Sequence, residues 1–257
     1  MSYDFRSRER FSDRVTNYAQ FRPGYPVEVM EIIQREFGLA AGATVADIGS
    51  GTGIFSQMLL DRGHRVFGVE PNQAMRQAAE DRFRSNPQFT SFSGTAEETG
   101  LPDHSVQLVT AAQAFHWFDA ERCRTEFARI LTSPGNVLLI WNERKRTGTP
   151  FQDDYECFLQ DYGTDFQQMT EQSQKKIAGL KEFFLPGTYR NFVLDQAQFL
   201  TLPEFTGRIL SSSFIPGEQH PRHTDVLRAI PVLFEQHAES GRIRLEYDVL
   251  IFLGQVS

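Results

Sequence analysis

Hydrophobic and polar positions alternate regularly between residues 43 and 142. Short apolar runs predict five strands, at residues 44–48, 64–69, 89–93, 106–112 and 137–141. Several of the intervening stretches carry apolar residues at helical spacing, and Asn72 and Asp119 stand where residues cap helices. Strands that alternate with amphipathic helices are typical of βαβ units wound into a parallel sheet.

The pattern changes on both sides of this core. Residues 144–188 are polar and mostly helical in pattern, without the strand signal that a further βαβ unit needs. Later strands are predicted at residues 192–200 and 242–253, with helices at 203–210 and 224–237 between them. Such an ending suits a sheet whose last strand runs antiparallel.

Two helices are predicted before the core. Phe11, Val15 and Tyr18 share one helical face, and residues 26–37 form a second helix that Gly38 ends. Together these patterns predict an α/β fold with a Rossmann-like, seven-stranded, mostly parallel sheet and an antiparallel last strand. A helical N-terminal extension and a helical insertion after the fifth strand complete it.

Composition excludes several classes of function. The chain has 257 residues, 40% of them hydrophobic, and a formal charge of −7, so a nucleic-acid partner held through its phosphates is not expected. Cys123 and Cys157 lie in predicted helices without metal-binding spacing, so no metal site is expected. Because we find neither a signal-peptide pattern nor an apolar run of about 18 residues, we expect a cytoplasmic protein without a membrane partner. We expect either a monomer or a homodimer.

The candidate ligand site begins at a glycine-rich loop. The first predicted strand ends in Asp47-Ile48-Gly49-Ser50-Gly51-Thr52-Gly53 and opens directly into a helix. Glycines permit a tight turn and a close approach to the backbone, while the free N–H groups of a helix start bind polar ligand atoms. Glu70 follows at the end of the second strand, where a carboxylate accepts hydrogen bonds from ribose hydroxyls.

The loop has three other interpretations. The first is a purely structural turn. The second is a nicotinamide-dinucleotide fingerprint, which requires glycine where Ile54 stands, and the third is a P-loop, whose Gly-Lys-Ser/Thr ending is missing. Asp47 also argues against a pyrophosphate, which it would repel, and suits a ligand that carries an ammonium and a sulfonium group.

These motifs together resemble those of class I S-adenosylmethionine-dependent methyltransferases. Residues 45–53 resemble the first motif of that family, residues 69–72 the second, and residues 94–97 the segment that contacts adenine. Residues 111–118 and 18–26 are similar to segments of the type-11 branch, the group that includes trans-aconitate and quinone-type methyltransferases. The resemblance covers residues 10 to 143 and is loose beyond them.

The resemblance implies S-adenosylmethionine as the cofactor and assigns residues to it. The implied cofactor-binding residues are Tyr18, Arg22, Tyr25, Asp47, Gly49, Ser50, Gly51, Thr52, Gly53, Glu70, Pro71, Asn72, Met75, Thr95, Ala96, Glu97 and Gln113. The glycines would line the methionine portion, Glu70 the ribose, and Pro71 with Met75 the adenine. Simpler alternatives remain: Arg22 in a structural turn, Met75 on a core face, and residues 95–97 in an ordinary loop.

The resemblance also implies a division of the chain and a reaction. We expect one methyltransferase domain over residues 1–257, with a cofactor-binding core at 40–143, a helical insertion or cap at 144–188, and the completing strands and helices at 189–257. His116 is the candidate catalytic residue, and Trp117 and Phe118 would wall the substrate pocket, although a histidine beside aromatic residues is often only structural.

The expected function is methyl transfer to a small-molecule acceptor, by O- or C-methylation of an organic acid or a phenolic metabolite. A carboxylate acceptor needs no base, whereas a phenol needs one such as His116. The alternatives are a noncatalytic protein that binds S-adenosylmethionine and a nicotinamide-dependent oxidoreductase. Four aromatic residues in the insertion, Tyr155, Phe158, Tyr162 and Phe166, predict either a mobile lid or the buried face of a fixed helix.

Overall fold

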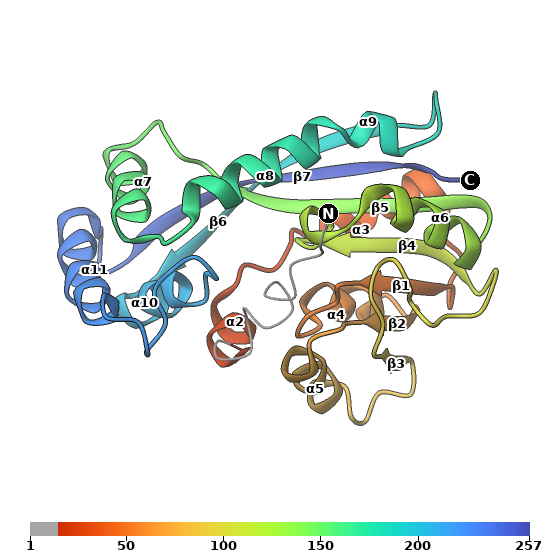
Figure 1. Ribbon diagram of the computed structural model, residues 1–257, viewed down its shortest axis with the longest axis horizontal. Coiled ribbons are helices and arrows are strands. Elements are labelled where there is room, and N and C mark those ends of the chain that lie inside the picture. The colour runs from red at the N-terminus through yellow and green to blue at the C-terminus, as the bar shows by residue number, and fades with distance from the viewer. Residues whose placement is uncertain (1–14) are drawn as a thin grey trace.

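A seven-stranded sheet forms the centre of the computed structural model, which describes residues 15–257 (Figure 1). Its strands are β1 (Thr44–Ile48), β2 (Arg65–Val69), β3 (Phe89–Phe92), β4 (Val106–Ala112), β5 (Leu131–Arg144), β6 (Arg190–Leu200) and β7 (Ile243–Gln255). The order across the sheet is β3-β2-β1-β4-β5-β7-β6. Strands β1 to β5 pair in parallel, and β7 is antiparallel to both neighbours. The predicted fold class is therefore confirmed.

The helices follow the predicted boundaries closely. They are α2 (Val15–Phe21), α3 (Glu28–Phe37), α4 (Ile54–Asp61), α5 (Gln73–Arg82), α6 (Ala120–Ile130), α7 (Pro150–Tyr162), α8 (Phe166–Ala178), α9 (Leu180–Phe183), α10 (Leu202–Leu210) and α11 (His223–His237), with a 3₁₀ turn η1 (Phe115–Trp117). Asn72 and Asp119 cap α5 and α6 through their side chains, as the sequence predicts. Phe11, which the pattern assigns to the leading helix, lies outside the described residues.

Apolar side chains bury both faces of the sheet. On one face, α6 and α9 cover the inner strands through residues such as Phe127 and Phe183. On the other, α3 and α4 do so through residues such as Ile33 and Leu59. The core strands β1 and β4 are nearly continuous apolar runs because helices cover both of their faces.

A third apolar cluster lies beyond the carboxyl end of β5. It joins α7, α10 and α11 to the halves of β6 and β7 that extend past the other strands (Figure 1). Tyr155, Phe158 and Phe166 of the insertion are buried in this cluster, and Tyr162 packs against it. We call α7, α10, α11 and these strand halves the cap. Along residues 15–257, no helix is both long and apolar enough to cross a bilayer.

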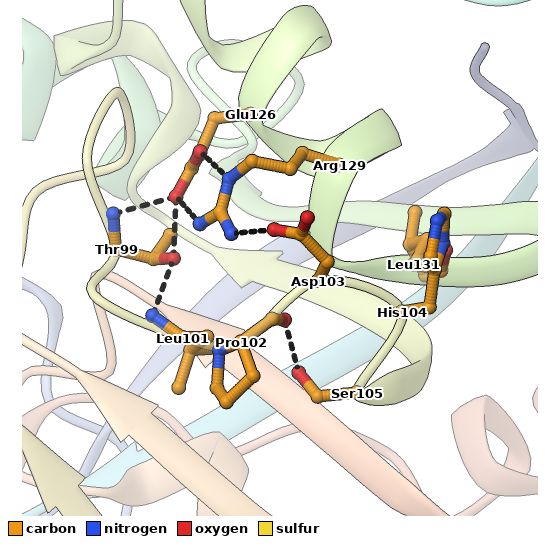
Figure 2. Close-up of polar contacts among 9 residues, drawn as sticks. All are labelled: Thr99, Leu101, Pro102, Asp103, His104, Ser105, Glu126, Arg129 and Leu131. Carbon is orange, nitrogen blue, oxygen red and sulfur yellow. Dashed lines mark hydrogen bonds and ion pairs between the residues drawn. The ribbon is translucent and has the colours of Figure 1, made fainter.

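A polar network fixes the loop between β3 and β4. Figure 2 shows Glu126 of α6 between Thr99 and Arg129. One Glu126 oxygen accepts hydrogen bonds from the Thr99 backbone N–H at 2.8 Å and from its hydroxyl at 2.6 Å. Arg129 pairs with Glu126 at 2.7 Å and with Asp103 at 2.6 Å. The network ties both ends of residues 99–103 to α6, and so holds the loop beside that helix.

Candidate active site

The glycine loop connects the end of β1 to α4 and requires glycine at its first position. Gly49 has a φ of +68°, and a Cβ built there would lie 2.6 Å from Ala114 Cβ and 3.3 Å from Phe118 Cζ. An L side chain would therefore meet both a strained backbone and occupied space. The tight packing draws the loop against the residues that follow β4.

Asp47 is completely buried at the end of β1. Its carboxylate accepts hydrogen bonds from Ser56 Oγ at 2.6 Å and from Thr110 Oγ1 at 3.1 Å. Burial raises the pKa of Asp47 to about 6, although these two hydroxyls act in the opposite direction. No cation neutralises Asp47 through an ion pair among the described residues, so a cationic ligand group beside it would be stabilised.

Glu70 holds two backbone segments together at the end of β2. Its carboxylate oxygens accept hydrogen bonds from the N–H of Gly51 at 3.0 Å and from the N–H of Asn72 at 2.8 Å. Burial raises the pKa of Glu70, and the two backbone hydrogen bonds act against this rise. Asn72 in turn accepts from the Met75 N–H at 3.0 Å. The loop, the acid and the start of α5 thus form one hydrogen-bonded unit.

Three cavities share lining residues at this edge of the sheet. The loop cavity lies against the glycine loop, and the predicted residues that line it are Tyr18, Arg22, Tyr25, Asp47, Gly49, Ser50, Gly51, Thr52 and Gln113. The β2 cavity is lined by Tyr18, Gly49, Gly51, Glu70, Pro71, Asn72, Met75, Gln113, Trp117 and Phe118. The cap cavity is lined by Tyr18, Arg22, Gln113, His116 and Trp117, together with residues of the cap and insertion.

Two residues stand where all three cavities meet. Tyr18 of α2 and Gln113, which follows β4, line each of them. Gln113 has a left-handed φ of 56°, its N–H donates to Ile140 O at 2.9 Å, and its Nε2 donates to Asn142 O at 3.2 Å. These bonds to β5 hold Gln113 in a strained conformation at the junction, and such strain is concentrated at functional sites.

The structure does not bring four of the predicted cofactor residues into these cavities. Gly53 is the N-cap of α4, and Thr95, Ala96 and Glu97 also line none of the three. Glu97 Oε1 instead accepts from the Asp119 N–H at 2.9 Å, at the start of α6. A carboxylate is stabilised there by the exposed N–H groups and the helix dipole. Contact between residues 95–97 and adenine stays a prediction.

His116 lies in η1 and faces the cap cavity. Trp141 Nε1 donates to His116 Nδ1 at 3.4 Å, so the neutral ring carries its proton on Nε2. Burial lowers the pKa of His116 to about 4, and the positive charges of Arg22 and Lys176 contribute to this lowering. His116 is therefore neutral near pH 7, and its Nε2 is a hydrogen-bond donor rather than a base.

Helix α8 holds this turn in place. Gln172 Nε2 donates to His116 O at 3.1 Å, and Lys176 Nζ donates to Phe118 O at 2.7 Å. The insertion is thus joined to the segment after β4 by two hydrogen bonds from one helix. Whether the insertion also moves as a lid stays a prediction.

Sequence reasoning missed the cap's contribution to the site. Arg208 of α10 lines both the loop cavity and the cap cavity, and Arg144, Arg146 and Tyr155 line the cap cavity. One signal could have identified Arg208: it is a charged residue three positions after the buried Phe205, on the apolar face of a short helix. No group of three or more His, Cys, Asp or Glu residues is placed to hold a metal ion within residues 15–257.

Known proteins resemble this chain in sequence and in fold. Residues 46–139 match the methyltransferase domain family. An uncharacterized methyltransferase of Mycobacterium tuberculosis is 38% identical over 134 residues, which are 52% of either chain, so this chain spans about half the length of the curated relatives it matches.

Solved structures share the fold over a longer range. A putative type II methyltransferase from Anaeromyxobacter dehalogenans superposes with a TM-score of 0.68 at 23% identity, over 91% of this chain and 98% of its own. The phosphoethanolamine N-methyltransferase 2 of Haemonchus contortus, solved with phosphomonomethylethanolamine and S-adenosylhomocysteine, has a TM-score of 0.54 at 18% identity and covers 100% of this chain and 60% of its own.

The sequence match and the fold agree on the same region. The matched residues run from β1 into β5 and contain the glycine loop, Glu70 and His116. Residues 46–139 therefore match the methyltransferase domain family in sequence, and they lie in a fold shared with a solved structure described as a methyltransferase.

Proposed function

We propose that this chain transfers the methyl group of S-adenosylmethionine to a small-molecule acceptor, an organic acid or a phenol. The observation that carries the proposal is the meeting of three cavities at Tyr18 and Gln113. Two of these cavities lie along the glycine loop and Glu70, and the third opens beneath the cap. A reaction between two bound ligands uses such an arrangement, because the ligands must meet at a single point.

The residues present fit the cofactor in two ways. Asp47 offers a buried carboxylate beside the loop cavity, which suits the ammonium and sulfonium groups of the methionine portion. Thr52 Oγ1 is buried beside the same cavity without a hydrogen-bond partner among the described residues, and a polar ligand atom would satisfy it. Glu70 would hold the ribose, with Pro71 and Met75 flanking the adenine.

The cofactor, when bound, supplies an activated methyl group. The chain's own task is to orient the acceptor, because placing a nucleophile about 3 Å from the reacting carbon converts a bimolecular step into an effectively unimolecular one. Trp117 lines the β2 and cap cavities and would exclude water from their junction, with Phe118 on the β2 side. His116 would donate a hydrogen bond from Nε2 to the acceptor.

The tautomer of His116 favours one of the two acceptor classes. A phenol must lose its proton during transfer and needs a base, whereas a carboxylate is already ionised. Because Trp141 occupies Nδ1 and the other ring nitrogen carries the proton, His116 offers the acceptor no free lone pair. Of the two classes, an organic acid therefore has the stronger support.

Binding and transfer test the proposal separately. Calorimetric titration with S-adenosylhomocysteine and with NADH should show micromolar affinity for the former only. Incubation with methyl-labelled S-adenosylmethionine and pooled small molecules should then transfer the label to an acid or phenol. Affinity for NADH alone would reverse the assignment, and tight binding of S-adenosylhomocysteine without transfer to any pool would favour a noncatalytic binding protein.

A further inference from the structure

The cap cavity is basic in an acidic protein. The chain carries a formal charge of −7, yet four arginines and one glutamate line this cavity: Arg22, Arg144, Arg146, Arg208 and Glu143. A concentration of cations against the net charge of the molecule focuses a positive potential inside the cavity. The ligand of this cavity is therefore expected to carry negative charge.

Two of the four arginines are neutralised by neighbouring acids. Arg144 forms an ion pair with Glu156 of α7, and Arg146 lies 3.9 Å from the same carboxylate and 4.0 Å from Glu143. The carboxylates of Glu156 and Glu143 neutralise the two guanidinium groups. Arg144 and Arg146 thus have partners within the protein and need none from a ligand.

Arg208 has no acidic partner within residues 15–257. It is 8% exposed, its Nε donates to Tyr247 Oη at 3.1 Å, and its Nη1 donates to Ser212 Oγ at 3.2 Å. No Asp or Glu among residues 15–257 forms an ion pair with it. A buried cation that has only neutral partners is costly, and the cost is offset when an anion binds. Two hydrogen bonds to neutral groups fix the guanidinium, and both come from Nε and Nη1 rather than from Nη2.

Arg22 also lines the loop cavity and the cap cavity, and it too lacks an acidic partner among the described residues. Its Nη2 donates to Ser211 O at 3.1 Å, and its buried Nε has no hydrogen-bond partner among the described residues. Its guanidinium lies 4.9 Å from the centre of the Tyr18 ring. No carboxylate pairs with Arg22 in the described part of the chain. Two arginines without a carboxylate partner among the described residues therefore line the cap cavity.

Close packing of α2 on α10 produces this pairing. A Cβ on Gly207 would lie 2.2 Å from two carbons of the Phe21 ring, so only glycine admits that ring against α10. Phe21 immediately precedes Arg22, and Gly207 immediately precedes Arg208. Gln198 Nε2 also donates to Phe21 O at 3.2 Å, which anchors the end of α2 to β6. The fold thus holds two like charges near the junction of the cavities.

We propose that Arg208 determines acceptor specificity by binding a carboxylate group of the methyl acceptor, with Arg22 completing the anion site. The inference rests on the proposed methyl transfer and narrows it to acceptors that are carboxylic acids. A carboxylate matches the planar guanidinium fork, whereas a neutral acceptor leaves both charges unpaired. Arg22 and Arg208 both line the loop cavity as well as the cap cavity, so the effect of changing Arg208 is measured on the cofactor as well as on the acceptor.

Paired acids and amides test this assignment. Methyl-labelled S-adenosylmethionine is offered with a panel of small aliphatic and aromatic dicarboxylic acids, and separately with the monoamides of the same compounds, so that every compound keeps one carboxylate oxygen to accept the methyl group. The acids should accept the label at least about 10-fold faster than their amides, as expected for loss of a charge-assisted hydrogen bond. The affinity for S-adenosylhomocysteine is measured by calorimetry on the same protein.

Variants at Arg208 distinguish an effect on acceptor binding from an effect on cofactor binding. Arg208→Gln should raise KM for the best acid about 10- to 100-fold while Kd for S-adenosylhomocysteine changes less than about threefold. Arg208→Lys should recover part of the loss because it restores the charge without the planar fork. Arg228→Gln, at an exposed position on α11, removes a charge of the same kind outside the cavity lining and should leave both constants unchanged.

Each outcome decides one question. If wild-type protein does not bind S-adenosylhomocysteine, the proposed function fails and this inference with it. If it does bind, three results would overturn this inference and leave the proposed function standing. They are equal transfer to acids and amides, no transfer to any acid, and an Arg208→Gln variant that weakens the binding of cofactor and acid equally. Because Arg208→Gln removes hydrogen bonds to Tyr247 and Ser212, its melting temperature is measured, and a poorly folded variant leaves Arg208→Lys and the acid-to-amide ratio to decide.

Discussion

The two sides of the active-site cavities are built on different principles. On the loop side, the glycine loop and the end of β2 hold each other through hydrogen bonds between a carboxylate and backbone N–H groups, as Glu70 does with Gly51 and Asn72. On the cap side, the lining residues come from helices and strands far apart in the chain, and Arg22 and Arg208 keep charges without a counterion among the described residues.

The difference matches what each side is proposed to bind, the cofactor on the loop side and the acceptor on the cap side. A cofactor shared by a whole family can be bound by a short continuous segment whose geometry depends on glycines and helix starts. An acceptor differs between enzymes, and its site is assembled by the packing of elements that vary. The loop side should therefore tolerate little change in shape, whereas the cap side should be sensitive mainly to charge.

The largest effect is expected from a change of shape on the loop side. Gly49→Ala introduces a methyl group 2.6 Å from Ala114 Cβ at a φ of +68°, so the loop must move. We expect affinity for S-adenosylhomocysteine, measured by calorimetry, to fall by at least about 100-fold. Gly63→Ala is the matched control, because Gly63 has a φ of +79° and a methyl group placed there would meet nothing within 4 Å. Equal losses in both variants would mean that backbone strain alone, and not the close approach, explains the result.

A change of charge on the loop side should have the next largest effect. Asp47→Asn keeps the shape and removes the carboxylate beside the loop cavity. Affinity for S-adenosylmethionine should fall about 10- to 100-fold, the range expected for a lost charged hydrogen bond. The ligand-free variant should be at least as stable as the wild type at pH 7, since burial of the charge is costly. A marked fall in melting temperature would instead assign Asp47 to the fold.

The pH dependence of stability tests whether the buried charge of Asp47 is costly to the fold. The pKa of Asp47 is raised to about 6, so its contribution to stability is present at low pH and decreases as pH rises from about 4 to 6. The pKa of His116 is lowered to about 4, so its contribution is lost as pH falls from about 6.5 to 4. The two oppose each other, and Asp47→Asn should therefore give a stability that rises more steeply with pH over this window. Urea titrations at several pH values measure the slope.

A smaller effect is expected where the loop after β3 is tied to α6. Glu126→Gln breaks the ion pair with Arg129 and should lower the free energy of unfolding by about 1–3 kcal/mol at pH 7. Burial raises the pKa of Glu126, but hydrogen bonds from Arg129 and Thr99 outweigh it and leave the pKa below its usual value. Its stabilisation is therefore present above pH 4.5 and lost below, and the variant should lack this acid-dependent part.

Glu121→Gln provides the control on the same helix, because Glu121 is exposed and has no ion pair among the described residues. Binding of S-adenosylhomocysteine should change little in either variant. A large loss of binding in Glu126→Gln alone would show that the loop after β3 contacts the cofactor, as residues 95–97 are predicted to do.

The smallest effect is expected at His116. If the acceptor is a carboxylate, His116→Gln, which keeps an N–H donor, should preserve kcat within about threefold. If His116 acts as a base, the same variant should lose about 100-fold or more in kcat. Steady-state rates with the best acceptor distinguish the two, and in the second case the phenol interpretation of the substrate would be the stronger one.

Much of the fold was predictable because local signals agreed with the global arrangement. The strands β1 and β4 begin and end where the apolar runs do, and Asn72 and Asp119 cap the helices they were assigned to. Beyond residue 143 the patterns identified strands and helices but not their partners. The position of β7 between β5 and β6 depends on pairing between distant segments, which periodicity does not encode.

The sequence motifs point to residues on the loop side and to His116 and Trp117 of the cap cavity, but not to the arginines that the later elements contribute. Asp47 lies at the end of the first strand, and Gly49 and Glu70 directly follow strand ends, so the spacing of the motif predicts its geometry. Arg208 was not predicted because its position beside Arg22 depends on the contact between Phe21 and Gly207, two residues that are far apart in the sequence. The carboxylate of Glu97 accepts a hydrogen bond at the start of α6, and its predicted contact with the cofactor stays a prediction.

The place of β7 has a consequence for how the chain is made. Strand β5 pairs with β7 along residues 136–144, and those partners are synthesised about a hundred residues later. Until β7 emerges from the ribosome, β5 presents a long apolar strand with an unpaired hydrogen-bonding edge, which invites association with other chains. During synthesis, this edge of β5 stays unpaired with β7 for the whole interval between the two strands.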